Sequence, residues 1–139
     1  MDCARKAFAY ITRAHDLLVL AHLDHPDVGL QVPSGTLHDG EDPAVGVVRE
    51  AREETGFSGL SVVRALGSIQ GHWGIDAEIH AFHMVFSEPV PERWEHGEFS
   101  YGEPIRFGFS WMAMDDPNLV LSAPQESFLA ELKRVLGWV

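Results

Sequence analysis

Residues 35–57 of this chain read GTLHDGEDPAVGVVREAREETGF, and this stretch decides how the rest of the sequence is interpreted. Asp42 belongs to the residue types that cap helix N-termini, and Pro43 fits the first helical position, where no backbone donor is required. Gly56 fits the position just past a helix end, where a left-handed backbone is common. The pattern therefore predicts a helix over residues 42–55, with a loop on each side.

Three glutamates share one face of this predicted helix. Glu50, Glu53 and Glu54 stand at positions i, i+3 and i+4, which are neighbours on a helix surface. A different arc carries the residues expected to pack against the protein, which are Ala44, Val48, Ala51 and Thr55. Clustered carboxylates repel one another, and a hard divalent cation among their oxygens relieves that repulsion. The spacing alone fits either a cation site or a solvated acidic face without a function.

The wider pattern resembles the Nudix box, the signature of the Nudix hydrolase family, written G-x5-E-x7-R-E-U-x-E-E-x-G-U with U a bulky apolar residue. Its invariant positions are matched by Gly35, Glu41, Arg49, Glu50, Glu53, Glu54 and Gly56, and Phe57 fills the last apolar position. Two positions depart from the pattern: Ala51 occupies the first U position, and Ser34 stands where many members have a second glycine. Gly46 costs about 1 kcal/mol inside a helix, so its presence predicts close approach of a neighbouring loop.

This resemblance implies an α/β fold of the Nudix type, an α/β/α sandwich with a mixed β-sheet between helices, in which the box forms a loop–helix–loop. It implies a pyrophosphohydrolase that cleaves a diphosphate linkage in a small nucleotide-type metabolite, with Mg²⁺ or Mn²⁺ as cofactor. The metal ligands that it implies are Glu50, Glu53, Glu54 and the backbone carbonyl of Gly35. Arg49 is expected to orient Glu53, with Glu41 as its partner or as a further ligand through water.

The general base is expected at one of two places. It is either Glu50 or a glutamate of the polar segment 87–103, where Glu95 and Glu98 are the central candidates. Trp73 and Tyr101 stand in predicted turn or loop segments, where a nucleobase can stack on their rings. For each loop acid the alternative is an exposed residue without a role, and for each aromatic residue it is core packing or a surface rim.

Outward from the box, the sequence predicts two strands before it, and three strands and a helix after it. Apolar patterning predicts strands over residues 6–12, 17–23, 60–69, 76–86 and 105–114, and a helix over residues 124–136. Residues 87–103, which carry PERWEHGEFSYGE, are expected to form a long polar loop. The order β-β-α-β-β-β-α predicts helices packed on a mixed sheet, and 139 residues fit one domain over residues 1–139.

Composition excludes several classes of partner and location. A formal charge of −11 and the lack of any long Lys/Arg cluster disfavour binding to long nucleic acids. No apolar stretch reaches the ~20 residues of a membrane span, and no secretory signal is recognised. The single cysteine, Cys3, excludes an intramolecular disulfide. We therefore expect a cytoplasmic protein that binds a small anionic substrate with the help of a cation; the family resemblance adds a homodimer.

Two other functions were weighed against hydrolysis. A family relative isomerises isopentenyl diphosphate, but it needs a cysteine in mid-chain, and the cysteine of this chain is Cys3. The alternative from another class is a non-catalytic nucleotide-sensing domain with the Nudix fold. Such domains tend to lose box carboxylates, which this chain keeps. Turnover of any diphosphate substrate separates the enzyme from the sensor.

Overall fold

The computed structural model describes residues 3–100 and 103–137, apart from the side chains of residues 98–100. Along the chain, the elements are β1 (Ala4–Arg13), β2 (Asp16–His22), η1 (Pro26–Val28), β3 (Ser34–Thr36), α1 (Pro43–Thr55), β4 (Leu60–His72), β5 (Asp76–Phe86), β6 (Arg93–Ser100), β7 (Glu103–Ala113), η2 (Gln125–Phe128) and α2 (Leu129–Val135). No helix in the described part of the chain has the length and hydropathy to cross a lipid bilayer.

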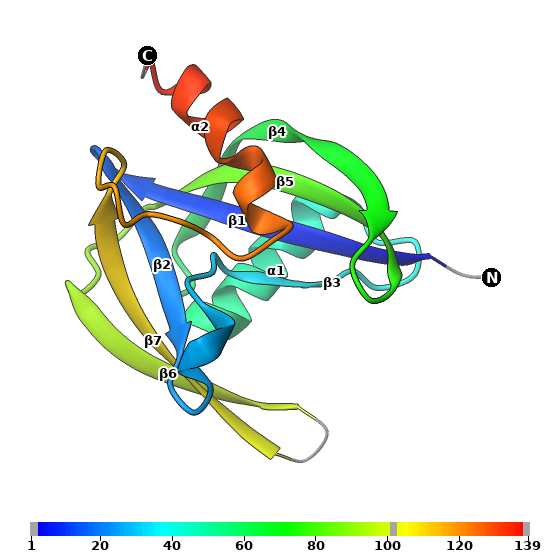
Figure 1. Ribbon diagram of the computed structural model, residues 1–139, viewed down its shortest axis with the longest axis horizontal. Helices are drawn as coiled ribbons and strands as arrows, with labels where there is room; N and C mark the ends of the chain where they lie inside the picture. The colour runs from blue at the N-terminus through cyan, green and yellow to red at the C-terminus, as the bar shows by residue number, and fades with distance from the viewer. Residues whose placement is uncertain (1–2, 101–102, 138–139) are drawn as a thin grey trace.

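The sheet is organised around β1. This strand pairs in parallel with β5 from Ala4 to Ile11, in antiparallel with β3 from Lys6 to Phe8, and at its end with β2. The strand order is β4-β5-β1-β2-β7-β6, with β3 beside β1. The sheet therefore has a mixed half, β4-β5-β1-β3, and an antiparallel half, β2-β7-β6, which diverge from the β1–β2 turn (Figure 1).

Alternation along β1 divides its side chains between two cores. Ala7, Ala9 and Ile11 belong to the core that includes the buried face of α1, whereas Phe8 and Tyr10 belong to the core under α2. The two helices lie on opposite sides of the strand, α2 in front and α1 behind in the view of Figure 1. The predicted α/β/α sandwich with a mixed sheet between helices is confirmed.

A buried glutamine fixes the segment that leads into β3. Gln125 accepts a hydrogen bond from the Val32 amide through Oε1 (2.7 Å) and donates one to the Val32 carbonyl through Nε2 (3.2 Å). Its own carbonyl accepts a hydrogen bond from the Tyr10 hydroxyl (2.6 Å), whose pKa is raised by burial. The Ala9 amide also donates to the Pro33 carbonyl (2.8 Å). The two residues before β3 are therefore held in a fixed position between β1 and Gln125.

The prediction of a polar loop over residues 87–103 is wrong for residues 93–100 and for Glu103, which belong to strands. Arg93–Ser100 forms β6 and pairs with β7 in antiparallel register, from Arg93 opposite Ser110 to Ser100 opposite Glu103. The segment contains Gly97 and several charges, which favour a loop, but pairing with β7 stabilises the extended backbone. The predicted helix 124–136 is also divided, because η2 precedes a shorter α2.

Candidate active site

Helix α1 begins and ends as the sequence predicts. The Asp42 side chain caps the helix by accepting a hydrogen bond from the Ala44 amide (2.8 Å), and Pro43 takes the first position. Gly56 ends it in the left-handed region, with φ of +84°, and its amide donates to the Arg52 carbonyl (3.0 Å). Both helix ends are therefore fixed, so the side chains between them have defined directions.

The glutamates of α1 differ in how deeply they lie in the structure. Glu54 is buried, with 7% of its surface exposed, whereas 55% of the Glu53 side chain and 16% of the Glu50 side chain are exposed. Val47 rather than Val48 is the fully buried valine of the helix. The expected separation of an apolar packing arc from a solvated acidic face is therefore wrong for Glu54, which lies at the edge of the packed face.

Strand β3 brings backbone groups to the buried carboxylates. The Ser34 amide donates a hydrogen bond to Glu54 Oε1 (3.2 Å). Gly35 lies directly against Glu50, and a Cβ atom at Gly35 would overlap the Glu50 carboxylate. The box glycine therefore leaves room for a carboxylate at the sheet edge, and Ser34, which replaces the second glycine of many members, contributes its backbone.

Arg49 lies among the carboxylates of α1 and the preceding loop. Its guanidinium forms a bidentate pair with Glu41 (2.9 Å for both bonds) and a third bond to Glu50 Oε1 (2.8 Å). The Arg49–Glu53 contact is longer, at 3.5 Å, so Glu41 and Glu50 are the stronger partners. Arg49 and the His38 amide hold the pKa of Glu41 well below its usual range, at about 2.

The side chains of the loop before α1 explain why a glycine stands at position 46. A Cβ atom at this position would collide with the side chain of Leu37 and would come within 2.8 Å of Glu41 Oε1. Both residues belong to the loop that precedes α1, so the predicted close approach of a neighbouring loop is confirmed. The approach brings Glu41 within reach of Arg49.

The oxygen atoms at this site are the kind that hard cations prefer. Within residues 3–97 and 103–137, no three His, Cys, Asp or Glu side chains stand close enough together to hold a metal ion as they are. Arg49 accounts for part of this, because it binds Glu41, Glu50 and Glu53. Carboxylates and backbone carbonyls are nevertheless the donor chemistry of Mg²⁺ and Mn²⁺ sites, and the absence of a side chain at Gly35 lets the Glu50 carboxylate lie directly against the backbone of β3. The residues present therefore fit such an ion.

A pocket of about 210 Å³ opens on the other side of β3. It is lined by Lys6, Phe8, Gln31, Ser34, Trp73, Ile75, Ala77, Ile79, Ala123, Pro124 and Gln125. Ser34 lines this pocket and also bonds Glu54, so the pocket and the carboxylates of α1 meet at one residue. The predicted stacking residue Trp73 is among the lining residues, whereas Tyr101 lies outside the described residues.

Lys6 is a pocket residue that the sequence analysis missed. It stands directly before the buried apolar run of β1, at a position that shares a strand face with Phe8. A charged residue two positions before a buried aromatic residue on the same strand face is the signal that could have identified it. Gln31, in the segment before β3, gave no comparable signal.

Of the two candidate bases on β6, Glu95 does not lie with the glutamates of α1. Glu95 is 67% exposed on its side chain and lies 4.0 Å from Arg106. Its neighbours Trp94 and His96 contact α1 instead, so by strand alternation Glu95 points to the opposite face. Glu98 pairs with Ile105 in the sheet, and its side chain is outside the described part of the structure.

Several solved structures have a similar fold. A UDP-X diphosphatase matches with a TM-score of 0.71 at 17% identity, over 98% of this chain and 64% of that chain. A MutT NUDIX hydrolase from Burkholderia pseudomallei matches with a TM-score of 0.67 at 21% identity, over 95% of this chain and 99% of that chain. An Ap4A hydrolase from C. elegans matches with a TM-score of 0.68 at 17% identity, over 98% of this chain and 100% of that chain. This chain thus spans less than two thirds of the diphosphatase, and at these identities the likeness establishes the fold alone.

A family model identifies the chain independently of these structures. The model of the NUDIX domain matches residues 4–134, which is nearly the whole sequence and includes the box helix, β3 and both halves of the sheet. The match confirms the predicted family and, with it, the predicted enzyme class, a hydrolase that acts on acid anhydrides. With this match over residues 4–134, the chain belongs to the NUDIX domain family.

Proposed function

We propose that this protein is a Mg²⁺-dependent Nudix pyrophosphohydrolase that cleaves a diphosphate linkage in a small nucleotide-type metabolite, a nucleoside diphosphate linked to another moiety. The observation that carries the proposal is the position of Ser34, whose amide bonds the buried carboxylate of Glu54 while the residue lines the neighbouring pocket. A molecule in the pocket would therefore be separated from the acidic helix by β3. The similar structures include a UDP-X diphosphatase and an Ap4A hydrolase, which supports a nucleotide substrate.

The proposed metal ligands are the carboxylates of Glu50, Glu53 and Glu54 and the backbone carbonyl of Gly35. A bound Mg²⁺ or Mn²⁺ would supply the positive charge that a diphosphate needs in a protein of net charge −11, and would acidify a water molecule. Arg49 now neutralises Glu50 and, at longer range, Glu53. We expect the ion to replace these two contacts, while the bidentate Arg49–Glu41 pair stays and keeps Arg49 beside the site.

Glu50 is the preferred candidate for the general base. Its carboxylate lies at the sheet edge against Gly35, and 16% of its side chain is exposed, so both a cation and water can reach it. Glu95 is less favoured because it points away from α1, and Glu98 stays a second candidate on β6. Loss of kcat in the Gln variant of one of the three, partly restored at high pH, would identify the base.

The pocket beside β3 is the proposed binding site for the nucleoside part of the substrate. Trp73 offers a ring on which a base can stack, and Lys6 offers a positive charge to a phosphate. Gln31 adds a polar side chain that can donate and accept hydrogen bonds. Tyr101 is proposed as a further stacking residue from the β6–β7 connection.

We also propose a cytoplasmic location and a homodimer in which the partner helps to complete the pocket. The location rests on the single cysteine, Cys3, and on a composition typical of cytoplasmic enzymes. The dimer rests on family resemblance. Light scattering of the purified protein measures the oligomeric state.

The test of the proposed function is a substrate screen. Nucleoside triphosphates, nucleotide sugars, dinucleoside polyphosphates and NAD-type compounds are incubated with enzyme and Mg²⁺, and released phosphate is measured after phosphatase treatment. We expect turnover of at least one class, abolished by excess chelator and restored by added Mg²⁺ or Mn²⁺. Turnover that persists undiminished in chelator contradicts the metal requirement. Binding of a nucleotide without turnover of any class favours the sensing domain instead.

A further inference from the structure

The C-terminal turn of α1 receives two hydrogen bonds from side chains of β6. The last carbonyls of a helix have no partner within the helix and must be satisfied from outside. Here the indole Nε1–H of Trp94 donates to the Thr55 carbonyl (2.9 Å), and the ring Nε2–H of His96 donates to the Glu53 carbonyl (3.1 Å). One carbonyl belongs to Glu53, and the other belongs to Thr55, the residue after Glu54; Glu53 and Glu54 are both proposed metal ligands.

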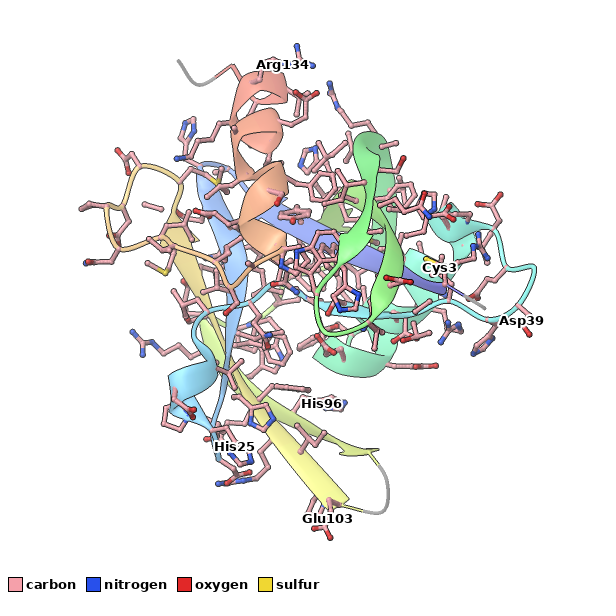
Figure 2. The ribbon with its side chains drawn as sticks, turned by 45° about the vertical axis from the view of Figure 1, so that its right-hand side comes forward. Cys3, His25, Asp39, His96, Glu103 and Arg134 are labelled. Carbon is pink, nitrogen blue, oxygen red and sulfur yellow. The ribbon has the colours of Figure 1, made fainter. Side chains whose placement is uncertain are left out.

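The same two side chains are packed tightly against the helix end. A Cβ atom at Gly56 would lie 2.8 Å from His96 Nδ1, so the absence of a side chain there allows the imidazole to approach. Trp94 stacks on Phe109 at 5.0 Å with nearly parallel rings, and it meets Phe57 edge-on at 5.2 Å. His96 lies on the side of the β6–β7 hairpin that faces α1 (Figure 2). The Trp94 bond is therefore partly buried in the packed structure, while the His96 bond lies at its exposed edge.

Glu53 has a weakly held side chain on a backbone that β6 contacts. It is 55% exposed and its ion pair with Arg49 is long, at 3.5 Å, so its own contacts hold it weakly. The backbone that carries it is held at its carbonyl by His96, and the backbone after Glu54 is held by Trp94. Glu54 in turn must reach the Ser34 amide across the gap between α1 and β3.

We propose that Trp94 and His96 are positioning residues for the metal-binding glutamates of α1, an inference that rests on the proposed function. By holding the carbonyls of Glu53 and Thr55, they set the direction and depth at which the Glu53 and Glu54 carboxylates stand opposite β3. The β6–β7 hairpin thus contributes to the metal site through the helix backbone, and neither side chain touches the ion or the substrate.

The test compares variants that remove one hydrogen bond each. Trp94→Phe removes the indole donor but keeps a ring, and His96→Leu removes the imidazole donor. His96→Gln keeps an N–H donor at nearly the same distance along the side chain. Trp111→Phe is the matched control, because it also removes an indole bond to a backbone carbonyl, that of Pro91 at 3.4 Å, but away from α1.

Three quantities are measured on the full chain: Mn²⁺ affinity without substrate, kcat and KM with Mg²⁺, and hydrogen exchange of the Gly56 and Phe57 amides. We expect Trp94→Phe and His96→Leu to weaken Mn²⁺ binding by about tenfold, to lower kcat with KM unchanged, and to speed exchange at the helix end. His96→Gln should restore most of the loss. Trp111→Phe should bind Mn²⁺ like the wild type, even if its global stability falls.

Wild-type Mn²⁺ affinity and kcat in both Trp94→Phe and His96→Leu would overturn the inference, whatever happens to their global stability. Failure of the proposed function would show itself in the wild type rather than in the variants. If the wild type itself neither binds Mn²⁺ nor cleaves a diphosphate, the metal site is wrong. The exchange rates of Gly56 and Phe57 in the variants then still decide whether β6 fixes the end of α1, because that measurement needs no metal.

Discussion

Glu53 and Glu54 are neighbours in sequence but occupy different surroundings, one mostly in solvent and the other buried against Ser34. We expect Glu53→Gln and Glu54→Gln each to lower the rate by ~100-fold or more, because each removes a ligand charge with little change of shape. The rate with Mg²⁺ is compared with that of Glu131→Gln, an acid of α2 paired with Arg134 outside the site. A near-wild-type rate in either variant would remove that residue from the site.

Which residues form the candidate site could be predicted from the sequence, but how deeply each side chain is buried could not. Helical spacing places Glu50, Glu53 and Glu54 on one face, and the box pattern adds Glu41, whose pairing with Arg49 is confirmed. Burial of Glu54 depends on β3, a strand of three residues that has no apolar pattern of its own. It forms because β1 offers hydrogen-bond partners from a distant part of the chain, which periodicity cannot reveal.

In α1, replacement of Gly46 by alanine tests whether helix propensity or side-chain packing dominates at that position. In an isolated helix, Gly46→Ala would stabilise by about 1 kcal/mol. Here the added methyl group collides with Leu37 and approaches Glu41, so we expect the variant to lose about 1–3 kcal/mol of unfolding free energy. Urea denaturation measures the change. Val45→Ala, at a 63% exposed position of the same helix, is the control and should be neutral or slightly stabilising. Stabilisation by Gly46→Ala would mean that the loop before α1 yields easily.

Strand β6 was the element that sequence reasoning placed wrongly. Its residues alternate between α1 and the opposite face, as Trp94 and His96 show, but their mixture of charges, glycine and aromatic rings resembles a loop. Periodicity measures whether one segment has an apolar face. The extended form of β6 is instead stabilised by pairing with β7 and by hydrogen bonds to carbonyls at the end of α1. Both interactions join β6 to other segments, so the sequence of β6 alone does not reveal them.

The stability of the whole molecule should fall in acid, starting with His83. This histidine is buried and its Nε2 bonds the Thr12 hydroxyl (2.7 Å); burial, with the charge of Arg64, lowers its pKa in the folded protein below the usual 6.5. As the pH falls below about 6.5, the unfolded chain takes up a proton that the folded protein resists, so stability is lost.

Urea titrations between neutral pH and pH 4.5 measure this loss. His83→Gln should flatten the upper part of the plot of unfolding free energy against pH. Below the usual Glu value of 4.5, protonation of Glu41 removes its pairing with Arg49, and this contribution is lost towards pH 2. An equally steep curve for His83→Gln and the wild type would assign the acid sensitivity to other groups.

The meeting of pocket and helix at Ser34 has a consequence for how such a protein can be redesigned. Apart from Ser34, the pocket walls come from β1, the segment around Gln31, the β4–β5 turn with Trp73, β5, and the start of η2 with the two residues before it. None of them belongs to α1. Apart from Gln125, which fixes the segment that leads into β3, the wall residues make no contact with the glutamates or Arg49 that their substitution would remove. Laboratory evolution for a new substrate can therefore vary the walls as an interchangeable module, with residues 35–57 kept as a constant cleaving unit.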